Sequence, residues 1–186
     1  MKKLALLIGL LLCAGCTNPG RETEAAREQC RKLAGLPGSF SVSVTAEYPD
    51  IREQFSMDCR WDPAGSLEFE LTGPQTLAGI RGSVTQTDAQ VRFDDTVLAL
   101  PLLDGDRLSP AAGPQLVMQA MRSGQFLSSV REDGRLHVSF GCGYEASAPT
   151  AEIWLTDGKP TEAELSLGGR RCLLLEIRSY ETDSGG

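Results

Sequence analysis

Hydrophobic and polar residues alternate along the chain soon after residue 38. Phe40, Val42, Val44, Ala46 and Tyr48 are separated by serine, threonine and glutamate residues. Successive side chains of a β-strand point to opposite faces, so this period of two predicts a strand with one buried face.

The same alternation recurs at short intervals. The expected strands cover residues 55–61, 67–71, 77–85, 90–93 and 96–100, and then 126–130, 135–144, 150–156, 161–167 and 170–180. Polar turns separate them, among them Asp157-Gly158 and Gly168-Gly169, as hairpin turns with positive φ angles require. The pattern predicts an antiparallel meander that is polar on one face and apolar on the other.

Two segments have the helical period of 3.6 instead. Residues 22–33 are rich in strong helix formers, and residues 115–122 place apolar side chains on one side, with Pro110 before them and Gly124 after them. One short helix covers little of a long sheet, so we expect the sheet to curl. The expected fold class is mainly β (α+β): a curled antiparallel sheet or incomplete β-barrel, with an N-terminal and a central helix over its concave face.

The start of the chain has the layout of a secretory signal. Two lysines precede an uncharged apolar run, residues 4–12, which is too short to span a bilayer as a stable helix. The two small residues directly before Cys16 resemble the bacterial lipobox, in which the cysteine is lipidated and becomes the N-terminus. An uncleaved membrane helix and a chance apolar start are the alternatives. Cys13 and Cys16 do not follow a strand, so a thioredoxin-like redox pair is not expected.

These features predict the domain organisation. We interpret residues 1–15 as a lipoprotein signal peptide, 16–21 as a lipidated tether, 22–180 as a single domain and 181–186 as a flexible tail. The expected location is the extracytoplasmic side of the cell membrane, or the outer membrane if the host has one, with acylated (for example palmitate-bearing) Cys16 as the anchor.

The net charge narrows the possible partners. It is −7 for the whole chain, and loss of Lys2 and Lys3 with the signal would make it −9. An acidic protein is repelled by nucleic acids and by anionic membrane surfaces. We therefore expect no nucleic acid partner, and membrane contact through the lipid anchor alone.

Residues that commonly carry catalysis are sparse. His137 is the only histidine and falls on the polar face of its strand, where an exposed side chain without a catalytic role is expected. The acidic groups at residues 94–95, 104–106 and 132–133 lie between predicted elements and suit turns better than metal sites. The remaining cysteines, Cys30, Cys59, Cys142 and Cys172, are scattered, and both disulfides and buried thiols stay open. No enzyme activity, metal or cofactor is expected.

Aromatic and methionine residues gather on the apolar faces. If the curled sheet encloses a cavity, these side chains would line it and suit an acyl chain or another apolar ligand. The candidate ligand-binding residues are Phe40, Val42, Phe55, Met57, Trp61, Phe69, Met118 and Met121. The alternative is that they form an ordinary packed core under the sheet.

Four segments together resemble the LolA/LolB-like lipoprotein-carrier superfamily. They are the extended Ser39–Asp50, "GPQTLAGIRGSVTQTDAQVRFDD" at Gly73–Asp95, "LSPAAGPQLVMQAMRSGQ" at Leu108–Gln125 and the Asp157–Leu167 hairpin. Within this group the chain is most similar to anchored lipoproteins of spore-forming Gram-positive bacteria, some of them related to germination. The resemblance implies an incomplete β-barrel whose concave surface binds lipid, an acylated protein or an apolar segment of a partner. It carries over no functional residue except Cys16.

Two functions follow as hypotheses. In the first, a membrane-anchored envelope lipoprotein binds a lipid, acyl chain or acylated protein in its concave cavity. In the second, the cavity is filled by the protein's own side chains, and the protein is a non-enzymatic scaffold or partner of another envelope protein, with spore germination as a candidate process.

Overall fold

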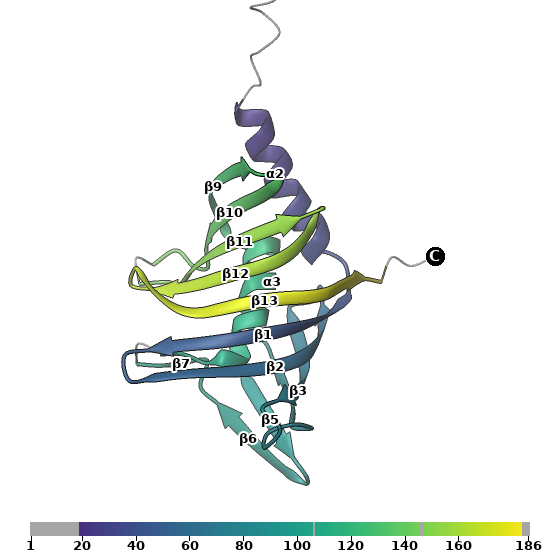
Figure 1. Ribbon diagram of the computed structural model, residues 1–186, viewed down its shortest axis with the longest axis vertical. Coiled ribbons are helices and arrows are strands. Elements are labelled where there is room, and N and C mark those ends of the chain that lie inside the picture. Colours follow the sequence, from purple (N-terminus) through teal and green to yellow (C-terminus); the bar gives the residue numbers. More distant parts are fainter. Residues whose placement is uncertain (1–18, 106, 146, 184–186) are drawn as a thin grey trace, which may run out of the picture.

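The computed structural model describes residues 19–105, 107–145 and 147–183. Within these residues the chain forms one eleven-stranded antiparallel sheet, a small two-stranded sheet and two α-helices (Figure 1). The predicted signal peptide and Cys16 lie outside the described residues.

The strands of the large sheet are β1 (Gly38–Tyr48), β2 (Ile51–Asp62), β3 (Ser66–Gly73), β4 (Arg81–Val84), β5 (Ala89–Phe93), β6 (Thr96–Leu100), β9 (Gln125–Glu132), β10 (Arg135–Gly141), β11 (Thr150–Thr156), β12 (Lys159–Leu167) and β13 (Arg170–Thr182). Their spatial order is β6-β5-β4-β3-β2-β1-β13-β12-β11-β10-β9. The first and last strands of the chain's sheet, β1 and β13, thus pair in its middle. The edge strands β6 and β9 do not pair with each other, so the sheet is not closed.

The period-two pattern sets the register of the central strands. In the β1–β2 pair, Phe40 lies opposite Cys59 and Val42 opposite Met57, and all four side chains are buried. A shift of one residue would turn these side chains to the polar face, so burial of one face fixes the register. The predicted curled, mainly β fold is confirmed.

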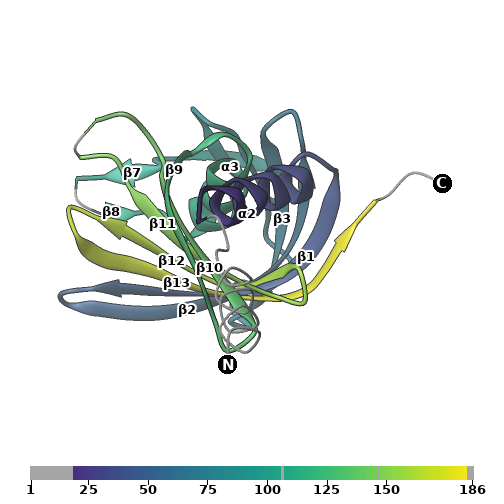
Figure 2. The same cartoon turned by 90° about the horizontal axis from the view of Figure 1, so that it is seen from above.

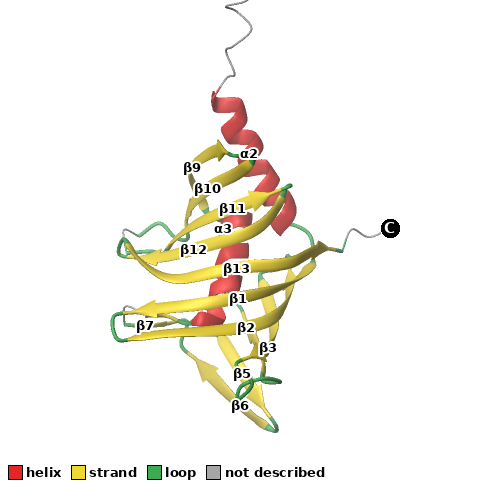
Figure 3. Ribbon diagram, viewed as in Figure 1, coloured by secondary structure: helices red, strands yellow, loops and turns green. Residues whose placement is uncertain are grey.

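Both helices lie on the concave side of the sheet. Helix α2 (Pro19–Ala34) and helix α3 (Gly113–Ser123) both lie within the curl of the sheet in Figure 2, and Figure 3 shows α3 behind the central strands. A 3₁₀ turn, η1 (Pro110–Ala112), leads into α3. The helix can approach β13 closely at Gly113, where an added Cβ would lie 3.1 Å from Leu173 Cδ1.

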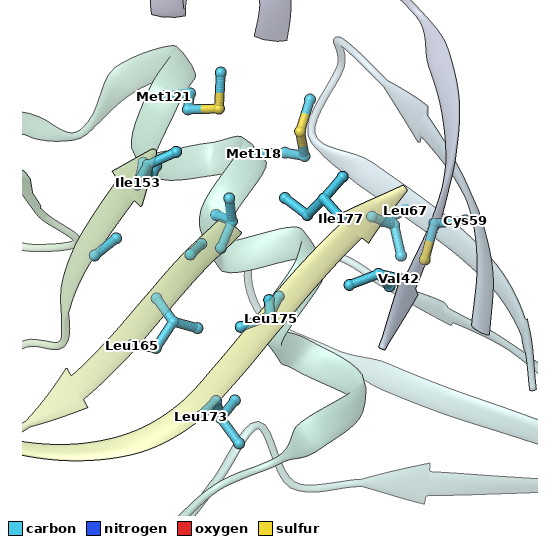
Figure 4. Packing of buried hydrophobic residues seen from close by; sticks show 14 of the residues in the cluster. Val42, Cys59, Leu67, Met118, Met121, Ile153, Leu165, Leu173, Leu175 and Ile177 are labelled. Atoms are coloured by element: carbon cyan, nitrogen blue, oxygen red, sulfur yellow. The ribbon is translucent and has the colours of Figure 1, made fainter. Parts of the chain in front are cut away.

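The core fills the space between the sheet and the helices. Met118 and Met121 of α3 face Leu175 and Ile177 of β13 and Ile153 of β11 (Figure 4), and all five are buried. Burial of apolar side chains is the main stabilising contribution in such a layered arrangement.

The structure differs from the sequence expectation at several element boundaries. Strand β2 begins at Ile51 instead of residue 55, β10 ends at Gly141 instead of residue 144, and β13 extends to Thr182, into the predicted tail.

Strand β4 begins at Arg81 instead of residue 77. The backbone turns before it, because the N–H of Leu77 donates to the carbonyl oxygen of Pro74 and the N–H of Ile80 donates to that of Leu77. Helix α2 starts at Pro19, three residues before the expected 22. The pattern did not predict the short hairpin of β7 (Leu103–Asp104) and β8 (Arg107–Leu108), whose strands are too short to show a period.

Candidate functional site on the concave face

The predicted cavity residues lie on the concave face, but most are enclosed by the protein itself. Seven are at most 4% exposed: Phe40, Val42, Met57, Trp61, Phe69, Met118 and Met121. The eighth, Phe55, is partly buried and packs against the same core. The inner face beneath the helices is therefore filled by side chains, and contact of these residues with a ligand stays a prediction.

Two side chains of the sheet fix the end of α2 over this face. Trp61 Nε1 of β2 donates a hydrogen bond to the carbonyl oxygen of Ala34 over 2.8 Å, and the Tyr180 hydroxyl of β13 donates to that of Leu33 over 3.3 Å. The last carbonyl groups of a helix lack partners within the helix. These two bonds supply such partners and fix the C-terminal end of α2 over β2 and β13.

The apolar inner face continues beyond the helices toward β6. Along one row of cross-strand partners, Cys59, Phe69, Gly82, Val91 and Leu98 follow one another from β2 to β6. Cys59 and Phe69 are each 4% exposed, Val91 is half-buried and Leu98 is 55% exposed. The inner face is therefore increasingly exposed toward the edge strand β6.

We call the uncovered end of this face the β5–β6 apolar patch and define it as Val91, Phe93, Leu98 and Leu100. The pairing of Ala89 with Leu100, Val91 with Leu98 and Phe93 with Thr96 puts these residues on the same face as buried Ala89. Phe93 is 60% exposed. Contiguous exposed apolar side chains of this kind mark interaction surfaces more often than isolated ones do.

The sequence reasoning did not single out this patch, although a signal was present. Strand β6 reads Thr96–Leu100, "TVLAL", with apolar residues on both faces and no charge. Edge strands usually carry a charge, a proline or a cover that prevents further association. In contrast, the other edge strand, β9, ends in Arg131 and Glu132 and lies beside α2 (Figure 1).

The outer face of the same strands has a different character. A hollow of about 690 Å³ is lined there by three carboxylates and three guanidinium groups, Asp58, Glu68, Glu70, Arg60, Arg81 and Arg92. Arg81 Nε donates to Glu70 Oε2 over 2.8 Å. Binding of an acyl chain there would require desolvation of these charged groups, so the inner face is the better candidate surface for an apolar ligand.

His137 lies on the outer face and takes part in a local network. Its Nε2 is 2.6 Å from Glu152 Oε2, and Ser139 Oγ donates to Glu152 Oε1 over 2.7 Å. The imidazole also stacks on the Trp154 ring, with centroids 4.5 Å apart. The carboxylate lies between the serine and the histidine, so these bonds do not form the serine–histidine contact that activates a nucleophile.

The other candidate groups adopt structural roles in the described part of the chain. Asp94 and Asp133 have φ angles of 49° and 51° and occupy hairpin turns, as the sequence predicted. Cys30, Cys59, Cys142 and Cys172 are free thiols, and burial raises the pKa of Cys30 to about 12 and that of Cys142 to about 11. Among the described residues no group of His, Cys, Asp and Glu could hold a metal ion, and no helix has the length and apolarity needed to cross a membrane.

Known structures resemble this chain in fold. No protein-family model matches the chain, and no curated protein matches its sequence. Among solved structures, a LolA superfamily protein from Nitrosomonas europaea is similar with a TM-score of 0.52 and 11% identity, over 88% of this chain and 94% of that one. A candidate outer membrane lipoprotein-sorting protein domain from Vibrio parahaemolyticus has a TM-score of 0.50 and 9% identity, over 89% and 92%. The chain therefore shares the fold of LolA superfamily and lipoprotein-sorting-like structures.

Proposed function

We propose that this protein is a membrane-anchored envelope lipoprotein that binds an apolar ligand, a lipid acyl chain or the acyl group of another protein, on the concave face of its sheet. The observation that carries the proposal is the β5–β6 apolar patch. Its side chains continue the core surface beyond α3, yet Leu98 and Phe93 remain 55% and 60% exposed.

An acyl chain would suit this surface for a simple physical reason. Each buried methylene group contributes about 0.8 kcal/mol, so a chain of several methylenes laid along the patch gains binding free energy without polar contacts. The fold supports the same conclusion, because it is shared with structures named for the LolA superfamily and for lipoprotein sorting. Anchoring through Cys16 on the extracytoplasmic side, and the absence of catalysis, belong to this proposal.

The test compares two neighbouring residues of β6. Leu98 faces inward and Val97 faces the outer hollow, and they are 55% and 50% exposed. We expect Leu98→Glu to weaken binding of an environment-sensitive fluorescent fatty acid at least about tenfold, because a carboxylate on the patch must be desolvated when the chain binds. Val97→Glu adds the same charge to the same strand and should leave the affinity unchanged.

Either of two results would contradict the proposal. Binding that is equally weakened by both variants would indicate a general charge effect, and binding unchanged in Leu98→Glu would remove the patch from the site. Far-UV circular dichroism of both variants checks that the sheet is intact. Both residues are half-exposed on an edge strand, so neither substitution should unfold the protein.

A non-enzymatic scaffold or partner protein of the cell envelope is the second candidate. The observation that favours it is the enclosed core, in which seven of the eight predicted cavity residues are at most 4% exposed. In that case the patch would contact an envelope protein, and the fatty acid would not bind. The predicted similarity to anchored lipoproteins of spore-forming bacteria, with a role in germination, belongs to this candidate and stays a prediction.

A further inference from the structure

A second hollow lies at the C-terminal half of α3, away from the β5–β6 apolar patch. It has a volume of about 380 Å³ and is formed by α3, the β4–β5 connection, the start of β9 and the β10–β11 connection. The β4–β5 and β10–β11 connections are far in the sequence from α3 and the adjoining start of β9, so only the fold brings them together. A volume near the lower end of the range for ligand pockets suits a compact ligand.

The lining of this hollow is rich in amides and lacks charge. Four of the chain's eight glutamines line it, Gln86, Gln115, Gln119 and Gln125. The described lining residues include no Asp, Glu, Lys, Arg or His, although 23% of the chain is charged. Burial raises the pKa of the Cys142 thiol there to about 11, so this group too is neutral near pH 7. An ionic ligand would find no counter-charge in such a lining.

The buried amides retain hydrogen-bonding capacity. Gln115 is 2% exposed, and its Nε2 donates to the carbonyl oxygen of Gly65 across 3.5 Å, at the long limit for a hydrogen bond. Gln119 Nε2 donates to Ser123 Oγ over 2.6 Å, while its Oε1 is buried and has no partner among the described residues. An amide has two donor hydrogens and an acceptor oxygen, so a polar, neutral ligand is complementary to this lining.

Apolar and aromatic groups complete the lining. Leu116 and Ala120 of α3 contribute apolar surface between the glutamines, and Tyr144, which is 97% exposed, offers an aromatic ring. An aromatic face with a polar hydroxyl suits a ligand that has both apolar and hydrogen-bonding surfaces.

We propose that this hollow binds a neutral N-acetylated sugar. The acetamido group would pair its N–H and C=O with the glutamine amides, with its methyl group against Leu116 and Ala120. The pyranose ring would lie on Tyr144, with its hydroxyls toward Gln86 and Gln125. A peptide also has amide groups, but an extended peptide needs a longer groove than this compact hollow provides.

The test measures binding of three soluble probes to the full chain by isothermal titration calorimetry. The probes are N,N′-diacetylchitobiose, cellobiose, which has the same ring linkage without acetamido groups, and a capped triglycine peptide. We expect the acetylated disaccharide to bind with a saturable isotherm and the other two to bind at least tenfold more weakly. Gln125→Ala and Tyr144→Ala should each weaken binding roughly two- to tenfold, as the loss of one hydrogen bond or one aromatic contact would.

Gln90→Ala is the matched control, because Gln90 is an exposed glutamine on the outer face of β5 and lines the other hollow. It should leave the affinity unchanged. The absence of saturable sugar binding below about 10 mM would overturn the proposal, since still weaker binding has no specificity. Equal binding of cellobiose would overturn the role of the acetamido group, and tighter binding of the peptide would overturn the sugar assignment. None of these results depends on whether the fatty acid binds at β5–β6.

Discussion

At Gly82 the sheet leaves no room for a side chain. This glycine lies in β4 opposite Phe69, and an added Cβ would be 2.4 Å from Phe69 Cζ and 2.5 Å from the carbonyl oxygen of Gln90. The second of these atoms belongs to the backbone of a paired strand and cannot rotate away. The absence of a side chain therefore lets the Phe69 ring lie over β4 and close this end of the core.

We expect Gly82→Ala to lower the free energy of unfolding by about 1–3 kcal/mol, the usual cost of overpacking. Urea denaturation followed by circular dichroism measures it. Ser83→Ala, at the next position of the same strand and facing outward, is the control and should change the free energy by less than about 0.5 kcal/mol. If Gly82→Ala also lowered the free energy of unfolding by less than about 0.5 kcal/mol, β3 and β4 would be able to move apart at little cost.

The packing of helix α2 on the sheet depends on a hydrogen bond from strand β2. Trp61 is 1% exposed, and its indole N–H is the donor to the Ala34 carbonyl at the end of this helix. Trp61→Phe keeps most of the apolar volume but leaves this buried carbonyl without its donor. We expect the free energy of unfolding to fall by about 1–3 kcal/mol.

The control for this substitution is Trp154→Phe. Trp154 lies on the outer face and stacks on His137, so its replacement removes an aromatic contact without uncovering a buried polar group. Its expected cost is at most about 1 kcal/mol. Equal losses in the two variants would mean that the bond to Ala34 contributes nothing beyond ring packing.

The elements differ in how far the sequence predicts them. Strands β1 and β2 have long alternating runs, so their buried faces could be predicted. The start of β2 at Ile51 was missed, because its first four residues, 51–54, are exposed and show no alternation of burial. The segment from Leu77 to Ile80 is equally apolar but forms turns, because the backbone N–H groups of its first and last residues donate hydrogen bonds to carbonyl oxygens three residues earlier in the chain. Residues such as Met57 could be assigned to the inner face, and a central helix over that face was expected. The degree to which α3 encloses these side chains could not be predicted, since it depends on the path of the helix through space.

Sites built from distant segments were beyond sequence reasoning for the same reason. Gln86, Gln115, Gln125 and Tyr144 belong to four separate segments and have no common spacing, yet they line one hollow. The β5–β6 apolar patch gave a local signal in the uncharged β6. That signal became meaningful only when β6 was known to be the edge of the sheet.

At the scale of the whole molecule, the buried thiols and the buried tyrosine predict that the folded state is less stable at alkaline pH. Burial raises the pKa of Tyr180 to about 12 from an ordinary value near 10, and that of Cys30 to about 12 from one near 9. It also raises the pKa of Cys142 to about 11 and that of Cys59. All four groups are neutral when protonated, and the folded state keeps them so.

The sign of the effect follows from proton binding. Below about pH 9 both the folded and the unfolded chain hold these protons, and stability is unaffected. Between about pH 9 and pH 12 the unfolded chain loses protons that the folded chain retains, so the free energy of unfolding falls, by up to about 1.4 kcal/mol per pH unit for each group. We expect the urea midpoint to be clearly lower at pH 10.5 than at pH 8.

Cys30→Ala separates this effect from general charge repulsion. Cys30 is 0% exposed at the inner side of α2, and its removal should lower stability somewhat at pH 8 but make the decline toward pH 10.5 shallower. Tyr144→Phe removes an exposed tyrosine and should leave the slope unchanged. If the midpoint stayed constant from pH 8 to 10.5, the core would have to admit water to these thiols, and the enclosed inner face under α2 and α3 would be an incorrect description. If Cys30→Ala declined as steeply as the unsubstituted chain, general charge repulsion, which grows as the net negative charge of this acidic protein increases with pH, would be the better explanation.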